Sequence, residues 1–203
     1  MLAGSVAARA EPVRIAALGD SLTQGYGLLQ QDGFTVQLEA WLKANGVDAS
    51  ILNAGVSGDT TAGGRARIDW TLTPDIDALI VALGGNDVLR GISPEEARAN
   101  LTAIMETAKD KALPVLIVGI SVPGNYGEDY RAAFLSIYPD LAETYDALYV
   151  ENFLAPLLAR AEAGENLARY LQNDGLHPNP DGVKVIVDSM GPVVAELAAR
   201  VAR

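Results

Sequence analysis

Short runs of apolar residues recur along the chain, and segments with a helical pattern separate them. Each run is rich in valine, isoleucine, leucine or alanine and lies next to glycine or polar turn residues. This pattern is typical of strands that are buried on both faces of a sheet. The sequence therefore predicts five strands, at residues 13–18, 48–52, 78–83, 115–120 and 147–150.

Between these runs, apolar residues repeat at helical spacing. Residues 34–42 carry an apolar stripe, and Gly46 behind them supplies a C-terminal stop. Ser93 precedes a proline and the glutamate of a capping box, which predicts the start of a second helix. The Asn-Pro pair at 179–180 opens a terminal helix in a similar way. The Gly-Pro pair at 191–192 is expected to break or kink that helix before its last segment.

Strands that alternate with helices predict a mostly parallel sheet, because each parallel crossover needs an element between the two strands. The expected fold is a three-layer α/β/α sandwich around a five-stranded parallel sheet. We find no internal repeat, low-complexity tract or linker that would divide the chain, so residues 12–203 are expected to form one domain. In such sheets the working residues lie on loops beyond the carboxyl ends of the strands.

The charge and composition of the chain narrow the classes of partner. Its 203 residues include 15 basic and 26 acidic side chains, which gives a formal net charge of −11. Nucleic acids and anionic membrane surfaces would be repelled overall, so neither is an expected partner. The chain has no cysteine, which excludes disulfides, thiolate-zinc sites and a cysteine nucleophile. No stretch of the body is long and apolar enough to insert stably in a bilayer.

The first eleven residues are small and mostly apolar, and the Ala-Arg-Ala sequence at 8–10 resembles a signal-peptidase site. No basic region or full-length apolar segment precedes it. Two interpretations stay open: the remnant of an export signal, which would make the protein periplasmic or secreted, and a disordered start without meaning for export, as in a cytoplasmic protein.

The only histidine of the chain, His177, belongs to one of four polar segments that follow predicted strands. A Gly-Asp-Ser turn at 19–21 follows the first strand, and Asp174 lies three residues before the histidine. A serine hydroxyl is a weak nucleophile until a base removes its proton, and a histidine that a carboxylate orients is the usual base. We therefore expect Ser21, His177 and Asp174 to form a catalytic triad.

The other two segments offer donors for an oxyanion. Acyl transfer needs hydrogen-bond donors directed at the developing negative charge, and a glycine amide on a tight turn or an asparagine side chain can serve. Gly58 lies after the second predicted strand and Asn86 after the third. The sequence predicts these two residues, together with the Ser21 amide, as the oxyanion hole.

Each of these catalytic assignments has a simpler structural alternative. Ser21 could cap the helix that follows it, Asn86 could stabilise its own turn, and Asp174 could fix the loop of His177 without orienting the imidazole. Three further carboxylates lie in the same segments and are expected to make loop-fixing hydrogen bonds only. They are Asp20, Asp59 and Asp87.

The residues and their order resemble the SGNH, or GDSL, serine hydrolase family. The four residues that name the family are matched, each in its expected block, by Ser21, Gly58, Asn86 and His177. The resemblance begins at Arg14 and covers nearly the whole chain. Segments 124–127 and 133–139 resemble the branch of bacterial thioesterase I/protease I/lysophospholipase and arylesterases.

The resemblance implies a flavodoxin-like sheet and a catalytic aspartate at Asp174. It also implies hydrolysis of small acyl esters and thioesters through an acyl-enzyme, without a metal or an organic cofactor. The segments 28–31, 88–92 and 121–127 are expected to shape the substrate pocket. The acyl chain length, the leaving group and the oligomeric state stay open.

Three other functions stay open as alternatives. Within the hydrolases the alternative is a carbohydrate O-acetyl esterase. A metal-dependent phosphoesterase would use Asp20, Asn86, Asp174 and His177, although a single histidine makes a poor two-metal site. A non-catalytic binding module on the same scaffold would be expected to lack a catalytic residue, and none is missing.

Overall fold

The sheet of this protein consists of five parallel strands. The computed structural model describes residues 11–201. The strand order is β2-β1-β3-β4-β5, as in flavodoxin-like folds. The strands are β1 (Val13–Gly19), β2 (Ala49–Gly55), β3 (Ala78–Ala82), β4 (Val115–Val118) and β5 (Leu148–Val150). All five predicted strands are confirmed, with small shifts at their ends.

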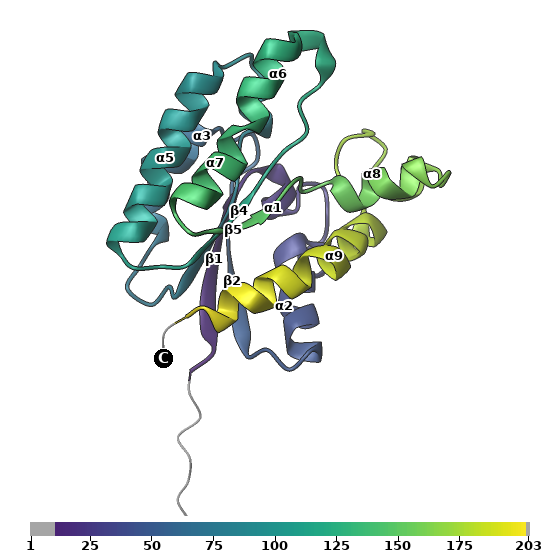
Figure 1. Cartoon of the computed structure of the whole chain (residues 1–203). Helices are drawn as coiled ribbons and strands as arrows, with labels where there is room; N and C mark the ends of the chain where they lie inside the picture. The colour runs from purple at the N-terminus through teal and green to yellow at the C-terminus, as the bar shows by residue number, and fades with distance from the viewer. Residues whose placement is uncertain (1–10, 202–203) are drawn as a thin grey trace, which may run out of the picture.

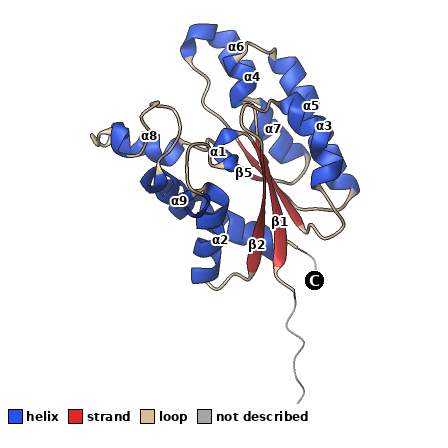
Figure 2. Cartoon of the chain, turned by 180° about the vertical axis from the view of Figure 1, so that it is seen from behind, coloured by secondary structure: helices blue, strands red, loops and turns tan. Residues whose placement is uncertain are grey.

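Helices cover both faces of the sheet, which confirms the three-layer sandwich (Figure 1; Figure 2). One face is packed by α2 (Phe34–Ala44), α8 (Ala155–Glu162) and α9 (Pro180–Ala199). The other is packed by α3 (Thr61–Thr71), α5 (Pro94–Asp110), α6 (Glu128–Leu135) and α7 (Ile137–Thr144). The shorter helices are α1 (Ser21–Gln24), α4 (Gly85–Leu89), η1 (Gln30–Asp32), η2 (Gly124–Tyr126) and η3 (Leu167–Arg169).

The strand β1 connects the two halves of the core. Its side chains alternate between the faces of the sheet, as the period of a strand requires. Ile15 and Ala17 pack with α2 and α9, whereas Ala16 and Leu18 pack with α3 and α5. All four are fully buried. This explains why the sequence of β1 is apolar without interruption from Ile15 to Leu18.

The register of the strands aligns their carboxyl ends. Gly19 at the end of β1 pairs with Gly55 at the end of β2 and with Ala82 at the end of β3. The three chain segments that leave these residues therefore start side by side at one edge of the sheet. Each of them carries one of the residues that the sequence predicts as functional.

The predicted ends of the helices are confirmed where their signals were strongest. Ser93 caps α5, because its Oγ accepts a hydrogen bond from the Glu96 N–H at 3.1 Å. Asn179 caps α9 by accepting from the Gly182 N–H at 3.0 Å. Beyond the end of α2, Gly46 adopts a left-handed conformation with φ of 79°.

Of the two outcomes expected at 191–192, a break or a kink, the break is wrong. Helix α9 continues through Pro192 to Ala199. A proline inside a helix removes one backbone hydrogen bond. The helix is maintained here by its buried side, on which Met190, Val194 and Leu197 pack into the core with α2. Tertiary packing therefore outweighs the local preference at this position.

The segment 8–10, on which the expectation of an export signal depends, lies outside the described residues. Within residues 11–201, no helix is long and apolar enough to cross a membrane.

The contact between α2 and α9 generates a prediction about stability. A Cβ atom at Gly191 would lie 2.5 Å from the ring of Trp41. Overpacking of this kind costs about 1–3 kcal/mol, and the helix propensity of alanine offsets roughly 1 kcal/mol of it. We expect Gly191→Ala to lower the free energy of unfolding, measured by urea denaturation. In a Trp41→Leu background the same change should be neutral or stabilising, and an equal loss in both backgrounds would refute the proposed clash.

Candidate active site

Ser21, His177 and Asp174 form a continuous chain of hydrogen bonds beyond the carboxyl edge of the sheet. The Oγ of Ser21 lies 2.9 Å from Nε2 of His177. On the other side of the ring, Nδ1 lies 2.7 Å from Oδ2 of Asp174. A neutral imidazole with its proton on Nδ1 satisfies both contacts, because it donates to the carboxylate and accepts from the serine hydroxyl. The structure thus brings together all three residues of the expected triad.

The position of Ser21 is determined by the turn after β1. Asp20 caps helix α1 and accepts from the Leu22 N–H at 3.0 Å, so Ser21 is the first helical residue and not the cap. The carbonyl oxygen of Ser21 accepts from the N–H of Gly25 at 3.0 Å. This short helix is therefore fixed at both ends. The alternative role of Ser21 as a helix cap is wrong.

Asp174 fixes its own loop and contacts the imidazole at the same time. Its Oδ1 accepts from the backbone N–H of Leu176 at 2.9 Å and of His177 at 3.0 Å, while Oδ2 contacts the ring. These bonds, led by that from Leu176 and then by that from the imidazole, lower the pKa of Asp174 to about 2. The two roles considered for Asp174 are compatible, and its carboxylate is ionised at any pH near neutrality.

The loop of His177 is anchored on both sides. The His177 carbonyl oxygen accepts from the Gln172 N–H at 2.8 Å, and Leu171 forms a bridge with Pro178. The ring of Tyr26 lies against the imidazole, with 4.8 Å between the ring centroids. The side chain of His177 is 15% exposed. These contacts hold the imidazole in one orientation between Ser21 and Asp174.

A cavity of about 360 Å³ contains Ser21, His177, Gly58 and Asn86 in its lining. The two predicted oxyanion donors therefore face the same space as the nucleophile and the base. Gly58 has φ of 80°, a conformation that favours glycine. The Asn86 side chain donates to Asp20 on another loop, with 3.3 Å between Nδ2 and Oδ2, so it is not restricted to its own turn.

The rest of the cavity is mainly apolar. Its wall fits the hydrocarbon part of a substrate better than a sugar or a nucleotide. Segments 88–92 and 121–127 contribute to the wall as expected, whereas segment 28–31 does not line it. The apolar lining residues are Leu22, Ala82, Val88, Leu89, Ile120, Pro123, Phe153, Leu154 and Leu176.

Two arginines support the site, and the sequence gives no signal for either. The guanidinium of Arg67 in α3 donates to the carbonyl oxygens of Gly19 at 3.0 Å and Ala54 at 2.6 Å. It also pairs with Asp59 at 2.7 Å. Arg90 donates to the Gly58 carbonyl oxygen at 2.6 Å. The two side chains hold backbone that is remote from them in sequence, so only the folded arrangement shows their role.

Asp87 links the segment of Asn86 to the segment after Gly58. Its two carboxylate oxygens accept from the N–H of Thr61 at 2.9 Å and from the Thr61 hydroxyl at 2.5 Å. Asp87 and Thr61 are fully buried, and burial raises the pKa of the carboxyl. Asp59 and Asp87 thus make the loop-fixing bonds that the sequence predicts. Asp20 makes one too, but it also contacts Asn86.

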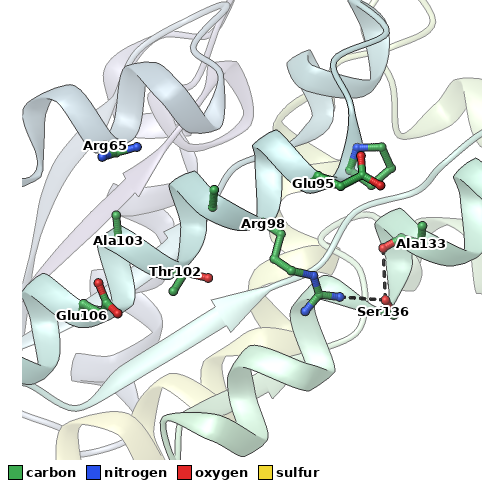
Figure 3. A pocket seen from close by; sticks show the side chains of 10 residues that line it. Arg65, Glu95, Arg98, Thr102, Ala103, Glu106, Ala133 and Ser136 are labelled. Atoms are coloured by element: carbon green, nitrogen blue, oxygen red, sulfur yellow. Dashed lines mark hydrogen bonds between the residues drawn. The ribbon is translucent and has the colours of Figure 1, made fainter.

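A second hollow lies between α3, α5 and the C-terminal end of α6, away from the triad (Figure 3). Arg98 at its edge donates to the Ser136 hydroxyl at 2.9 Å and to Asp140 at 2.7 Å. Its charge is therefore already paired, and none of the predicted functional residues lines the hollow. Among residues 11–201, no group of three or more histidine, cysteine, aspartate or glutamate residues could hold a metal ion.

Comparison with known proteins agrees with this geometry. The sequence model of the GDSL-like Lipase/Acylhydrolase family matches residues 17–185. The chain belongs to this family. The match includes Ser21, Gly58, Asn86, Asp174 and His177, and it confirms the resemblance that the sequence suggests.

The relatives of the chain in this family match it over most of their length. The chain is 35% identical to an arylesterase of Vibrio mimicus over 171 residues, which cover 83% of this chain and 81% of that protein. It is 34% identical over 175 residues to thioesterase 1/protease 1/lysophospholipase L1 of Escherichia coli (strain K12), with 85% and 79% covered. The solved structure of AlinE4, an SGNH-hydrolase family esterase, has 43% identity and a TM-score of 0.74, with 96% and 100% covered.

Proposed function

We propose that this member of the GDSL-like family is a serine esterase that hydrolyses carboxylic acyl esters and thioesters through an acyl-enzyme. The observation that carries the proposal is the chain of contacts from Ser21 to His177 and on to Asp174, at 2.9 and 2.7 Å, in the wall of an apolar cavity. The same cavity is lined by Gly58 and Asn86, which can stabilise an oxyanion.

In the first half of the reaction, the Oγ of Ser21 attacks the carbonyl carbon of the substrate while Nε2 of His177 takes the hydroxyl proton. The Nδ1–H stays hydrogen-bonded to Asp174, which stabilises the imidazolium. The carbonyl oxygen becomes an oxyanion, for which the amides of Gly58 and Ser21 and the side chain of Asn86 are the donors. When the C–O or C–S bond breaks, the imidazolium returns its proton to the leaving group.

In the second half, water replaces the alcohol or thiol. His177 removes a proton from the water, whose oxygen attacks the acyl carbon. When the bond between Oγ and the acyl carbon of the second tetrahedral intermediate breaks, the imidazolium returns this proton to Oγ, which releases the acid and restores Ser21 and His177. Apart from the substrate and water, each group used in these steps belongs to this chain.

The class of substrate follows from the cavity and from the relatives. An apolar wall next to the nucleophile fits an acyl chain, and the names of the relatives support esters and thioesters. Rates across p-nitrophenyl esters from acetate to palmitate, measured beside the matching acyl-CoA thioesters, would define the chain length and the leaving group. Activity on acetyl groups alone would favour a carbohydrate O-acetyl esterase.

The first prediction about activity concerns the nucleophile and the base. Ser21→Ala and His177→Ala should each abolish hydrolysis of p-nitrophenyl butyrate, and the double variant should be no worse than either single variant because the two groups act as a unit. Thermal unfolding is the control for folding. A folded Ser21→Ala enzyme with near-normal turnover would rule out the serine-esterase function.

The second prediction concerns the charge of Asp174. Because the pKa of this carboxyl is lowered to about 2, it stays ionised from pH 5 to 9. Asp174→Asn should therefore lower kcat severely, on the order of a thousandfold or more, at every pH in this range. The measurement is the full pH profile of kcat in both enzymes. Recovery of the variant to wild-type turnover at any pH would contradict a role in orienting the imidazole.

A further inference from the structure

A buried carboxylate next to the nucleophile takes no part in the reaction described above. Asp20 is 7% exposed. Its Oδ1 accepts from the Leu22 N–H at 3.0 Å, and its Oδ2 accepts from Nδ2 of Asn86 at 3.3 Å. The first contact is an ordinary helix cap, which a serine could provide equally well. The capping role does not explain the second contact, which joins Asp20 to Asn86.

Burial makes the ionised form of this side chain unfavourable. Desolvation raises the pKa of Asp20 to about 6, although the hydrogen bonds from Leu22 and Asn86 act in the opposite direction. A cap alone does not account for an aspartate at such a place, because an uncharged cap would avoid this cost. The contact with Asn86 explains why a carboxylate occupies this position in place of an uncharged cap.

The chemistry of the two groups fixes the direction of the Asn86 amide. An ionised carboxylate can only accept hydrogen bonds, so it selects the NH₂ end of the amide over its oxygen. One N–H of Asn86 is then directed to Asp20. The other is left free for the cavity that Asn86 lines together with Ser21. With the amide reversed, its oxygen would replace these donors and would repel an oxyanion.

We propose that Asp20 is a positioning residue that holds the Asn86 side chain, through the hydrogen bond to its Nδ2, in the orientation that donates to the oxyanion. The proposal rests on the esterase function proposed above. Hydrogen bonding to a charge also polarises the amide, which strengthens its second N–H as a donor. Asp20 and His177 interact electrostatically as well. The experiment must therefore separate an effect through Asn86 from an effect through the imidazole.

The variant Asp20→Asn tests the orientation with little change of shape. Its oxygen can keep the cap of Leu22, which places an NH₂ group where Oδ2 lies in the wild type. That group would donate to the oxygen of Asn86 and favour the reversed amide. We expect kcat to fall by about a hundredfold with KM nearly unchanged, as for the loss of one oxyanion donor.

The variant Asp20→Ser separates orientation from simple loss of the contact. Serine caps the helix well but is too short to hold Asn86. It leaves the amide free to rotate without favouring the reversed form, so we expect a smaller loss of kcat, roughly tenfold. A matched control is Asp140→Asn, which neutralises a carboxylate paired with Arg98 away from the cavity and should leave kcat unchanged.

A double-mutant cycle with Asn86→Ala identifies the route of the effect. If Asp20 acts through Asn86, Asp20→Asn should cost little further activity once the amide is absent. Each kcat is taken from the plateau of a full pH profile, so that a displaced limb is not mistaken for a lower plateau. The same hundredfold loss in both backgrounds would overturn the proposal and favour an effect through His177 or on folding.

This test is distinct from the test of the esterase function. Active Ser21→Ala enzyme would reject the serine-esterase function itself. Inactive Ser21→Ala together with a fully active Asp20→Asn enzyme would keep that function and reject only the role of Asp20. If Asp20→Asn fails to fold in thermal unfolding, the Asp20→Ser variant carries the same cycle, and additivity with Asn86→Ala rejects the proposal there too.

Discussion

The parallel register of β1 with its two neighbours is the constraint on which the rest of this structure depends. Because Gly19, Gly55 and Ala82 end their strands side by side, the segments with Ser21, Gly58 and Asn86 leave the sheet at one edge. The burial of both faces of β1 fixes this register, since a shift by one residue would exchange the side chains of the two core layers. The packing that stabilises the sheet therefore also assembles the nucleophile and the oxyanion donors.

His177 lies at the same site, although no strand of the sheet ends directly before it. Its loop precedes α9 and depends on local bonds, of which those of Asp174 to two backbone amides are the most direct. These bonds stabilise the carboxylate in its ionised form and direct its second oxygen at the imidazole. The base is thus positioned by a small preorganised loop, whereas the nucleophile is positioned by the sheet. The hydrogen bond between Ser21 and His177 joins the loop that positions the base to the sheet that positions the nucleophile.

The sequence predicts the parts of the fold that local rules determine, namely the buried strands, the capped ends of α5 and α9, and the polar segments that follow the strands. It misses what depends on contacts between distant segments. Helix α3 contains Gly63 and Gly64, which lower helix propensity, yet a Cβ atom at Gly64 would lie 2.2 Å from the Leu83 side chain. Close packing against Leu83, the residue that follows β3, explains that glycine. The bonds from Arg67 and Arg90 to backbone oxygens are hidden from a sequence for the same reason.

The buried carboxylates at this site lower the free energy of unfolding at neutral pH. A carboxyl whose pKa is raised in the folded state stabilises the fold at low pH, and this stabilisation is lost as the pH rises through the folded value. For Asp20, with a pKa of about 6, the ionised form at neutral pH costs on the order of 3 kcal/mol relative to an exposed aspartate. Burial also raises the pKa of Asp87. Asp20 contacts the segments of Ser21 and Asn86, and Asp87 links the segment of Asn86 to the one that follows Gly58. The unfavourable charge therefore lies where fixed dipoles benefit the reaction. This distribution is expected if activity depends more on the preorganised amide of Asn86 than on a small further gain in the free energy of unfolding.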